Sequence, residues 1–195
     1  MPFVIKNSIP RFIQDNTENQ QQTSDIFGYK WEKRDTFEDN ISNHLSVWLD
    51  KKYGKINKDF LKKFDTKPFI LDAGCGAGLS GMSFFKNILN EVNYLGVDIS
   101  NAVDTAKLRF FENKINGGFI QCDLSRLPFL KNTFDIIFSE GVLHHTDNTY
   151  NALESLSQYL KLNGKLFFYV YKKKSPIREF SDDFIRDKVQ NLSPD

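Results

Sequence analysis

Beyond Pro68, short apolar segments recur along the chain, and a stretch with helical spacing separates each from the next. The apolar segments have the length of buried strands; they are Phe69–Asp72, Tyr94–Val97, Gly118–Cys122, Phe134–Phe138 and Lys165–Tyr171. Strands that alternate with helices predict a parallel sheet with right-handed crossovers and helices on both faces. The pattern therefore predicts an α/β fold built on a doubly wound sheet.

The ends of the expected helices are marked by residues with known capping preferences. The first helix runs to about Leu89, and Ser100 is placed to cap the next one. A third helix over Thr149–Leu160 is expected to end before Gly164, which suits a left-handed terminal position. A last helix is expected over Ser181–Leu192, because two aspartates fall in its first turn, where the helix dipole stabilises negative charge.

The part of the chain before the first strand is less regular. Residues 1–26 contain prolines and a polar run, so we expect a flexible arm with little regular structure. Residues 27–66 should form accessory helices and a lid, because Asn57 can cap one short helix and four apolar residues have helical spacing: Ile41, Leu45, Trp48 and Leu49. The core of the fold is expected over residues 67–195.

Charge and cysteine content exclude several classes of protein. Lys and Arg total 26 and Asp and Glu total 25, so the net charge of +1 gives no overall field that would attract nucleic acid or an anionic membrane. No apolar run reaches the ~18 residues of a membrane span or the length of a signal peptide, and we expect a cytoplasmic protein. Cys75 and Cys122 form no Cys-x-x-Cys pair, so neither a disulfide scaffold nor a metal site is expected.

Acidic residues and glycines follow the predicted strands. Asp72, Asp98 and Asp123 end or follow the first three strands, and Ser139-Glu140-Gly141 follows the fourth. Because ligands of open parallel sheets bind beyond the carboxyl ends of the strands, these residues should share one rim. The glycine loop Gly74–Gly78 lets the backbone approach a ligand closely, and the helix after it offers N–H groups to an anion.

The spacing of these residues indicates a nucleoside ligand. Asp98 lies 20 residues beyond Gly78, the spacing at which an acid can accept hydrogen bonds from both ribose hydroxyls. The run Gly76–Gly81 matches the dinucleotide fingerprint Gly-x-Gly-x-x-Gly, but its first glycine comes four residues after Asp72, too late for the tight turn. Asp72 would also face a pyrophosphate of like charge. With S-adenosylmethionine the interaction with Asp72 becomes attractive instead of repulsive, because its amino group favours a carboxylate and it carries no phosphate.

At this point the sequence resembles the class I S-adenosylmethionine-dependent methyltransferases. Four ordered motifs carry the resemblance: Ile70–Gly78, Gly96–Ser100, Gln121–Leu124 with Leu127-Pro128-Phe129, and Phe134–Ser139 with Leu143-His144-His145. The resemblance covers about residues 26–190 and is closest over 68–170. It implies a sheet with strand order 3-2-1-4-5.

The resemblance also implies a role for individual residues. Asp72 and the glycines Gly74, Gly76 and Gly78 would hold the methionine part of the cofactor, and Asp98 would hold the ribose. Ile99 and Leu124 would sandwich the adenine, and Asp123 would bind its exocyclic amine. Ser139 would line the methyl-donor pocket.

Two departures from the family pattern stand out. The N-terminal sequences Ile9–Phe12 and Phe27–Trp31 look like those of a subgroup in which a small zinc ribbon precedes the core, but the cysteines of that ribbon are absent here. The aromatic residues at 27–31 either form a lid over the cofactor or pack as an ordinary part of the N-terminal arm. Family members usually add an antiparallel strand pair after the fifth strand, and the chain has no room for it before Asp195. We expect the fifth strand to be shielded by a partner chain, such as a second copy in a homodimer, or by the terminal helix, or else the chain to be a truncated product of a longer gene.

Methyl transfer by in-line displacement needs alignment first and a general base only where the acceptor loses a proton. His144 is the best base candidate, set against the interpretation that it is a hydrogen-bonded wall residue, and His145 is a second candidate. Glu140 either touches the cofactor or faces water. Lys172-Lys173-Lys174 can bind an anionic substrate or simply face solvent, and Arg178 can pair with a substrate carboxylate or only with Asp182. We expect a methyltransferase acting on a small molecule; the alternatives are a catalytically silent binding subunit and an NAD-dependent reductase.

Overall fold

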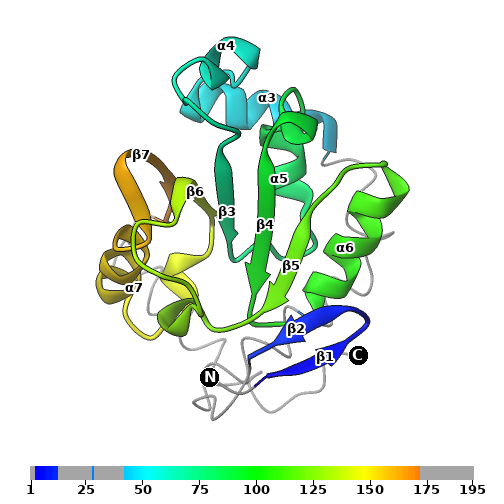
Figure 1. Ribbon diagram of the computed structural model, residues 1–195, viewed down its shortest axis with the longest axis vertical. Helices are drawn as coiled ribbons and strands as arrows, with labels where there is room; N and C mark the ends of the chain where they lie inside the picture. The colour runs from blue at the N-terminus through cyan, green and yellow to red at the C-terminus, as the bar shows by residue number, and fades with distance from the viewer. Residues whose placement is uncertain (1–2, 13–27, 29–41, 172–195) are drawn as a thin grey trace, which may run out of the picture.

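The computed structural model describes residues 3–12, 28 and 42–171 of the chain. Within this part a seven-stranded sheet has the order β1-β2-β5-β4-β3-β6-β7 (Figure 1). The strands are β1 Val4–Lys6, β2 Ile9–Arg11, β3 Phe69–Ala73, β4 Asn93–Asp98, β5 Gly118–Gln121, β6 Phe134–Glu140 and β7 Leu160–Tyr169. The five strands from β3 to β7 are parallel and keep the order β5-β4-β3-β6-β7, which confirms the expected 3-2-1-4-5 arrangement.

Helices and short 3₁₀ turns connect the strands and cover the sheet. The α-helices are α3 Ser42–Tyr53, α4 Lys58–Leu61, α5 Leu79–Phe84, α6 Ala102–Glu112 and α7 Thr149–Ser157. The 3₁₀ turns are η1 Leu89–Glu91, η2 Leu124–Arg126 and η3 Leu143–His145. No helix of the described residues has the length and hydropathy needed to cross a membrane.

Both faces of the sheet are buried, as a doubly wound fold requires. Successive residues of β3 point to opposite faces. Ile70 packs with Phe84 of α5 and Phe110 of α6, while Leu71 packs with Leu156 of α7. Because the strands are covered on both sides, their polar groups collect at the ends, and the carboxyl ends form the rim that holds the site.

The N-terminal arm differs from the expectation. Residues 4–11 form a β-hairpin, and its second strand pairs in parallel with β5 through Arg11 and Gln121 (Figure 1). Asn7 and Ser8, both with positive φ (54° and 57°), form the two-residue turn, a geometry that asparagine tolerates well. The expectation of little regular structure was therefore wrong for residues 4–11, because this short turn signal was not recognised.

Side-chain contacts fix the hairpin to α6. The buried Arg11 guanidinium donates hydrogen bonds to both carboxylate oxygens of Asp104, at 2.9 and 2.8 Å, and another to the amide oxygen of Gln121. The Lys107 ammonium donates to the Asn7 carbonyl oxygen at 2.6 Å. A buried charge paired in this way holds the hairpin in one register.

Two of the predicted helix caps are confirmed and one is not. Asn57 caps α4 as expected, and the Ser100 hydroxyl accepts a hydrogen bond from the Ala102 amide at 3.2 Å in the first turn of α6. The prediction for Gly164 was wrong: α7 ends at Ser157 and Gly164 lies inside β7. The left-handed residue is Asn163, with φ 65°, at an irregularity in the pairing of β7 with β6.

In the described part of the chain, β7 pairs only with β6 and no antiparallel strand follows it. Its Leu162 side chain is 91% exposed. The expected helix over 181–192 lies outside the described residues, as do the lid aromatics at 27 and 29–31.

Candidate functional site

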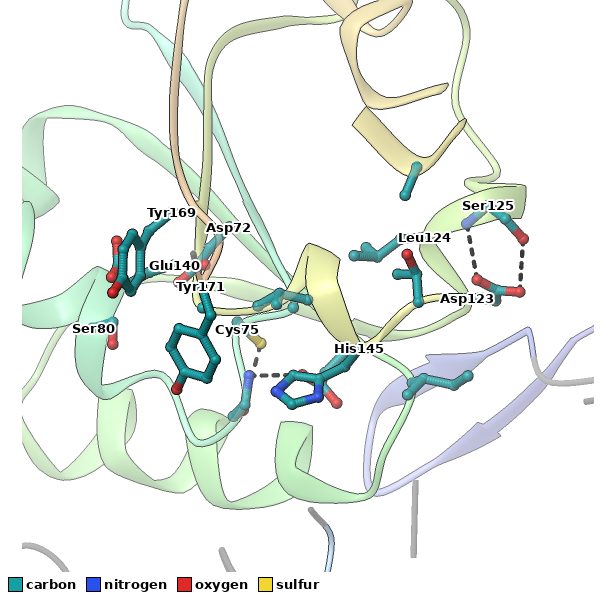
Figure 2. A pocket seen from close by; sticks show the side chains of 18 of the residues that line it. Asp72, Cys75, Ser80, Asp123, Leu124, Ser125, Glu140, His145, Tyr169 and Tyr171 are labelled. Carbon is teal, nitrogen blue, oxygen red and sulfur yellow. Dashed lines mark hydrogen bonds between the residues drawn. The ribbon is translucent and has the colours of Figure 1, made fainter. Parts of the chain in front are cut away.

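A cavity of about 1200 Å³ lies at the carboxyl ends of the parallel strands. Loops after β3, β4, β5 and β6, the end of β7 and helices α3 and α7 contribute its wall (Figure 2). The described lining carries no lysine or arginine and five acidic residues: Asp72, Asp98, Asp123, Glu140 and Asp147. The site therefore favours a ligand with positive charge.

Two of the three predicted glycines in the loop after β3 line the cavity. Gly74 and Gly76 line the cavity with φ of 80° and 51°. A Cβ on Gly74 would lie 2.3 Å from a methyl group of Val142, so only glycine fits there. Gly78 does not line the cavity; it packs against α6, where a Cβ would lie 3.2 Å from that of Ala106.

Asp72 is the penultimate residue of β3 and the most enclosed acid of the site. Its side chain is buried, lines the cavity and accepts a hydrogen bond from the Tyr94 hydroxyl. Burial raises the pKa of Asp72 to about 7, and the Tyr94 hydrogen bond opposes that rise. Gly81 of α5 permits this arrangement, because a Cβ there would lie 2.2 Å from an Asp72 carboxylate oxygen. A cation in the cavity would favour the ionised form of this acid.

Asp98 ends β4 and is held by backbone and side-chain donors. One carboxylate oxygen accepts from the Gly76 amide at 2.8 Å, and the other accepts from the Ser100 amide at 2.9 Å and the Ser100 hydroxyl at 2.7 Å. Burial raises the pKa of Asp98, and these hydrogen bonds oppose that rise. The carboxylate faces the cavity in a fixed orientation, as a group that accepts hydrogen bonds from a ligand must.

Ile99, Asp123 and Leu124 also line the cavity, as the resemblance implied. Asp123 accepts hydrogen bonds from the Ser125 amide and hydroxyl at 2.8 and 2.7 Å, and so caps the short turn η2 (Figure 2). Leu124 and Ile99 give this part of the cavity two aliphatic walls beside one acceptor. That combination suits a flat, apolar ring with an exocyclic donor.

Besides Gly78, two further sequence-predicted residues lie away from the cavity. Ser139 is fully buried and donates a hydrogen bond to the Ala73 carbonyl oxygen at 2.9 Å, while the next residue, Glu140, lines the cavity instead. A one-residue shift along a strand turns a side chain to the opposite face, which accounts for the difference.

His144 is the other residue that the structure places elsewhere. It is not among the lining residues, and its ring nitrogens are buried without a hydrogen-bond partner in the described part of the chain. Burial lowers its pKa to about 4, and its ring stacks 3.9 Å from that of Tyr171. His145 lines the cavity instead (Figure 2), and its ring centre lies 4.1 Å from that of His144.

A second cluster, which sequence analysis did not predict as a unit, lies on the α3 side of the cavity. Glu140 accepts hydrogen bonds from the Tyr53 hydroxyl and, at 2.9 Å, from the Lys52 ammonium. Burial raises the pKa of Tyr53 and lowers that of Lys52. The sequence signals for this cluster were Glu140, which follows the fourth strand, and the apolar stripe that contains Trp48, four residues before Lys52.

Other candidates can be placed only in part. Lys172-Lys173-Lys174 and Arg178 lie outside the described residues. Among the residues that the structure describes, no group of three His, Cys, Asp or Glu side chains could hold a metal ion. Cys75 lines the cavity with a buried thiol, and burial raises its pKa well above the usual value, so it is a weak nucleophile.

Comparison with known proteins gives one family. Residues 71–168, half of the chain, match the family described as a methyltransferase domain. An uncharacterized protein of Methanocaldococcus jannaschii is 35% identical over 153 residues, which cover 77% of this chain and 61% of the relative. Phosphoethanolamine N-methyltransferase 1 of Arabidopsis thaliana is 29% identical over 140 residues, which cover 69% of this chain and 28% of that enzyme.

A solved structure has the same fold. The Haemonchus contortus phosphoethanolamine N-methyltransferase 2, in complex with phosphomonomethylethanolamine and S-adenosylhomocysteine, superposes with a TM-score of 0.55 at 22% identity. The superposition covers 71% of this chain and 32% of that one. This chain thus spans less than two thirds of the length of each of these relatives. The matching family, the parallel sheet and the glycine loop at its rim agree, and the chain belongs to the methyltransferase domain family.

Proposed function

We propose that this protein is an S-adenosylmethionine-dependent methyltransferase that acts on a small-molecule acceptor. The observation that carries the proposal is the acidic rim: the described lining has five carboxylates and no lysine or arginine. S-adenosylmethionine carries a sulfonium and an ammonium group, both attracted to such a wall. A pyrophosphate, as in NAD, would be repelled by it, which argues against the reductase alternative.

The residues present fit the cofactor in kind. Gly74 is a cradle that a side chain would fill, which leaves backbone open to the methionine part. We assign the amino group to Asp72 and the ribose hydroxyls to Asp98. The adenine is assigned to the slot between Ile99 and Leu124, with Asp123 as acceptor for its exocyclic amine. Gly78 is left out of this set because it packs on α6.

When bound, S-adenosylmethionine supplies a methyl group on a positively charged sulfur. The residues of this chain hold and align the reactants and keep water away. Alignment alone lowers the activation free energy of such a reaction by ~7 to 11 kcal/mol. Tyr169 and Tyr171 line the cavity on the side away from Asp123 (Figure 2), so we assign the acceptor to that end.

Calorimetry with the full chain tests this function. We expect S-adenosylmethionine and S-adenosylhomocysteine to bind and NAD not to bind. Binding of NAD alone would reverse the assignment. Binding of S-adenosylmethionine without transfer to any member of a metabolite panel would favour the silent binding subunit.

We also propose that the protein works in the cytoplasm and that the core over residues 67–195 follows a lid over 27–66 and an arm over 1–26. A second copy of the chain, another partner or the segment after residue 171 is proposed to cover the β7 edge. Light scattering coupled to size exclusion gives the molar mass: a dimer supports the first of these, and a monomer points to the others.

A further inference from the structure

The Lys52 ammonium lies between two aromatic rings. It is 3.9 Å from the centre of the Trp48 ring and 3.1 Å from the centre of the Tyr169 ring, and it donates to a Glu140 carboxylate oxygen at 2.9 Å. The rings of Trp48 and Tyr169 meet edge to face, 5.8 Å apart. We call Trp48, Tyr169 and Glu140 the ammonium cage.

The cage belongs to the cavity wall. All three of its residues line the cavity, whereas Lys52 does not. Figure 2 shows Glu140 and Tyr169 together, near Asp72 and Tyr171. The Glu140 side chain is only 8% exposed, so its charge needs a cation close by. An ammonium group in the cage is therefore in reach of a ligand that fills the acceptor end.

The occupant of the cage is replaceable. Lys52 sits at the end of a flexible four-carbon stem and is 21% exposed, so it can swing into solvent without moving α3. A lysine ammonium is strongly hydrated, and burial already lowers the pKa of Lys52. A methylated ammonium is less strongly hydrated and gains more from aromatic faces. A ligand of that kind can take the place of the lysine.

We propose that the ammonium cage is the subsite for a cationic amine group of the methyl acceptor, and that Lys52 holds the subsite until the acceptor displaces it. The inference rests on the proposed function and narrows the acceptor to a compound that bears an ammonium group. It also assigns Lys52 as a specificity residue that competes with the acceptor.

Calorimetric titration of the full chain with tetramethylammonium chloride tests the cage. Lys52→Ala should tighten tetramethylammonium binding about tenfold, because the competing cation is gone. Lys51→Ala, which removes an exposed lysine from the same helix, should leave it unchanged. In the Lys52→Ala background, Glu140→Gln should lose the gain, and the neutral isostere tert-butanol should show no gain in any variant.

The proposal is overturned if Lys52→Ala binds tetramethylammonium no more tightly than the parent, or if tert-butanol gains equally. Binding of S-adenosylhomocysteine to each variant reports its folding; if Lys52→Ala fails that check, Lys52→Gln, which keeps most of the stem, replaces it. A parent protein that does not bind S-adenosylhomocysteine contradicts the proposed function, while the response to tetramethylammonium judges the cage separately.

Discussion

The two halves of the rim are built differently. At the ends of β4 and β5, each carboxylate accepts hydrogen bonds from a serine two residues further along the chain: Asp98 from Ser100 and Asp123 from Ser125. Asp98 also accepts from the amide of Gly76, which belongs to the glycine motif. On the α3 side, Glu140 is held by Lys52 and Tyr53, which are 88 and 87 residues away in sequence. The first half is encoded locally and can be recognised in a motif, whereas the second exists only after the helix has packed on the sheet.

The largest expected effect concerns the glycine loop, where the space around Gly74 is too small for a side chain. Gly74→Ala would bring a Cβ within 2.3 Å of Val142 at a φ of 80°, so the loop must shift. We expect binding of S-adenosylhomocysteine to weaken by at least ~100-fold, a loss of ~3 kcal/mol, measured by calorimetry.

Gly54→Ala is the matched control for this change. Gly54 has a similar φ of 84° but open space around it. The control should cost ~1 to 2 kcal/mol of stability and leave the affinity unchanged. Equal losses of affinity in both variants would mean that backbone strain, rather than the cradle, determines binding.

The next effect concerns the ribose. Asp98→Ala should weaken S-adenosylhomocysteine binding by ~1 to 3 kcal/mol, because the sugar hydroxyls and the donors on Gly76 and Ser100 lose their acceptor. Asp135→Asn, an acid remote from the cavity that pairs with Lys161, serves as control and should bind normally. An unchanged affinity in Asp98→Ala would place the ribose elsewhere.

A third test uses pH to examine Asp72. Its folded pKa of about 7 lies above the usual value, so the acid is neutral below that pH. A cationic ligand group prefers the ionised form, and S-adenosylhomocysteine affinity should therefore fall up to ~10-fold per pH unit below 7. Titrations between pH 5.5 and 8 should show this slope in the parent and a flatter one in Asp72→Asn.

The same shift predicts a change in stability without ligand. Because the folded form holds its proton to a higher pH than the unfolded chain, the Asp72 contribution weakens stability as pH rises from ~4 to 7. Asp72→Asn should remove this part of the slope in urea unfolding. A variant whose slope equals that of the parent would contradict the origin given for the raised pKa.

The smallest effect concerns His144. Its ring nitrogens are buried without partners in the described part of the chain, and its ring stacks on that of Tyr171. His144→Phe keeps an aromatic ring and removes the unsatisfied atoms, so we expect a gain of ~1 kcal/mol in stability and unchanged S-adenosylhomocysteine binding. Loss of methyl transfer in a stable variant would restore the general-base role.

The parts that sequence could predict are those with short-range signals. The apolar strands and the glycine loop could be recognised in the sequence. They also allowed prediction of the order of the five parallel strands and of the positions of Asp72, Asp98 and Asp123 at the cavity. Whether Ser139 or Glu140 faces the cavity depends on the phase of a strand that is apolar on both faces, so alternation gives no answer there. The contact of Lys52 with Glu140 and Tyr169 depends on tertiary packing, which no local pattern records.

The N-terminal hairpin has a consequence for synthesis on the ribosome. Its turn at Asn7 and Ser8 is translated before the other described elements, but the strand on which the hairpin docks ends at Gln121, 110 positions after Arg11. A contact of such sequence separation forms late. The nascent chain must therefore carry the apolar Ile9 and the charged Arg11 without their partners while most of the core is translated, and slowing translation before residue 121 would lengthen the time in which a chaperone is needed.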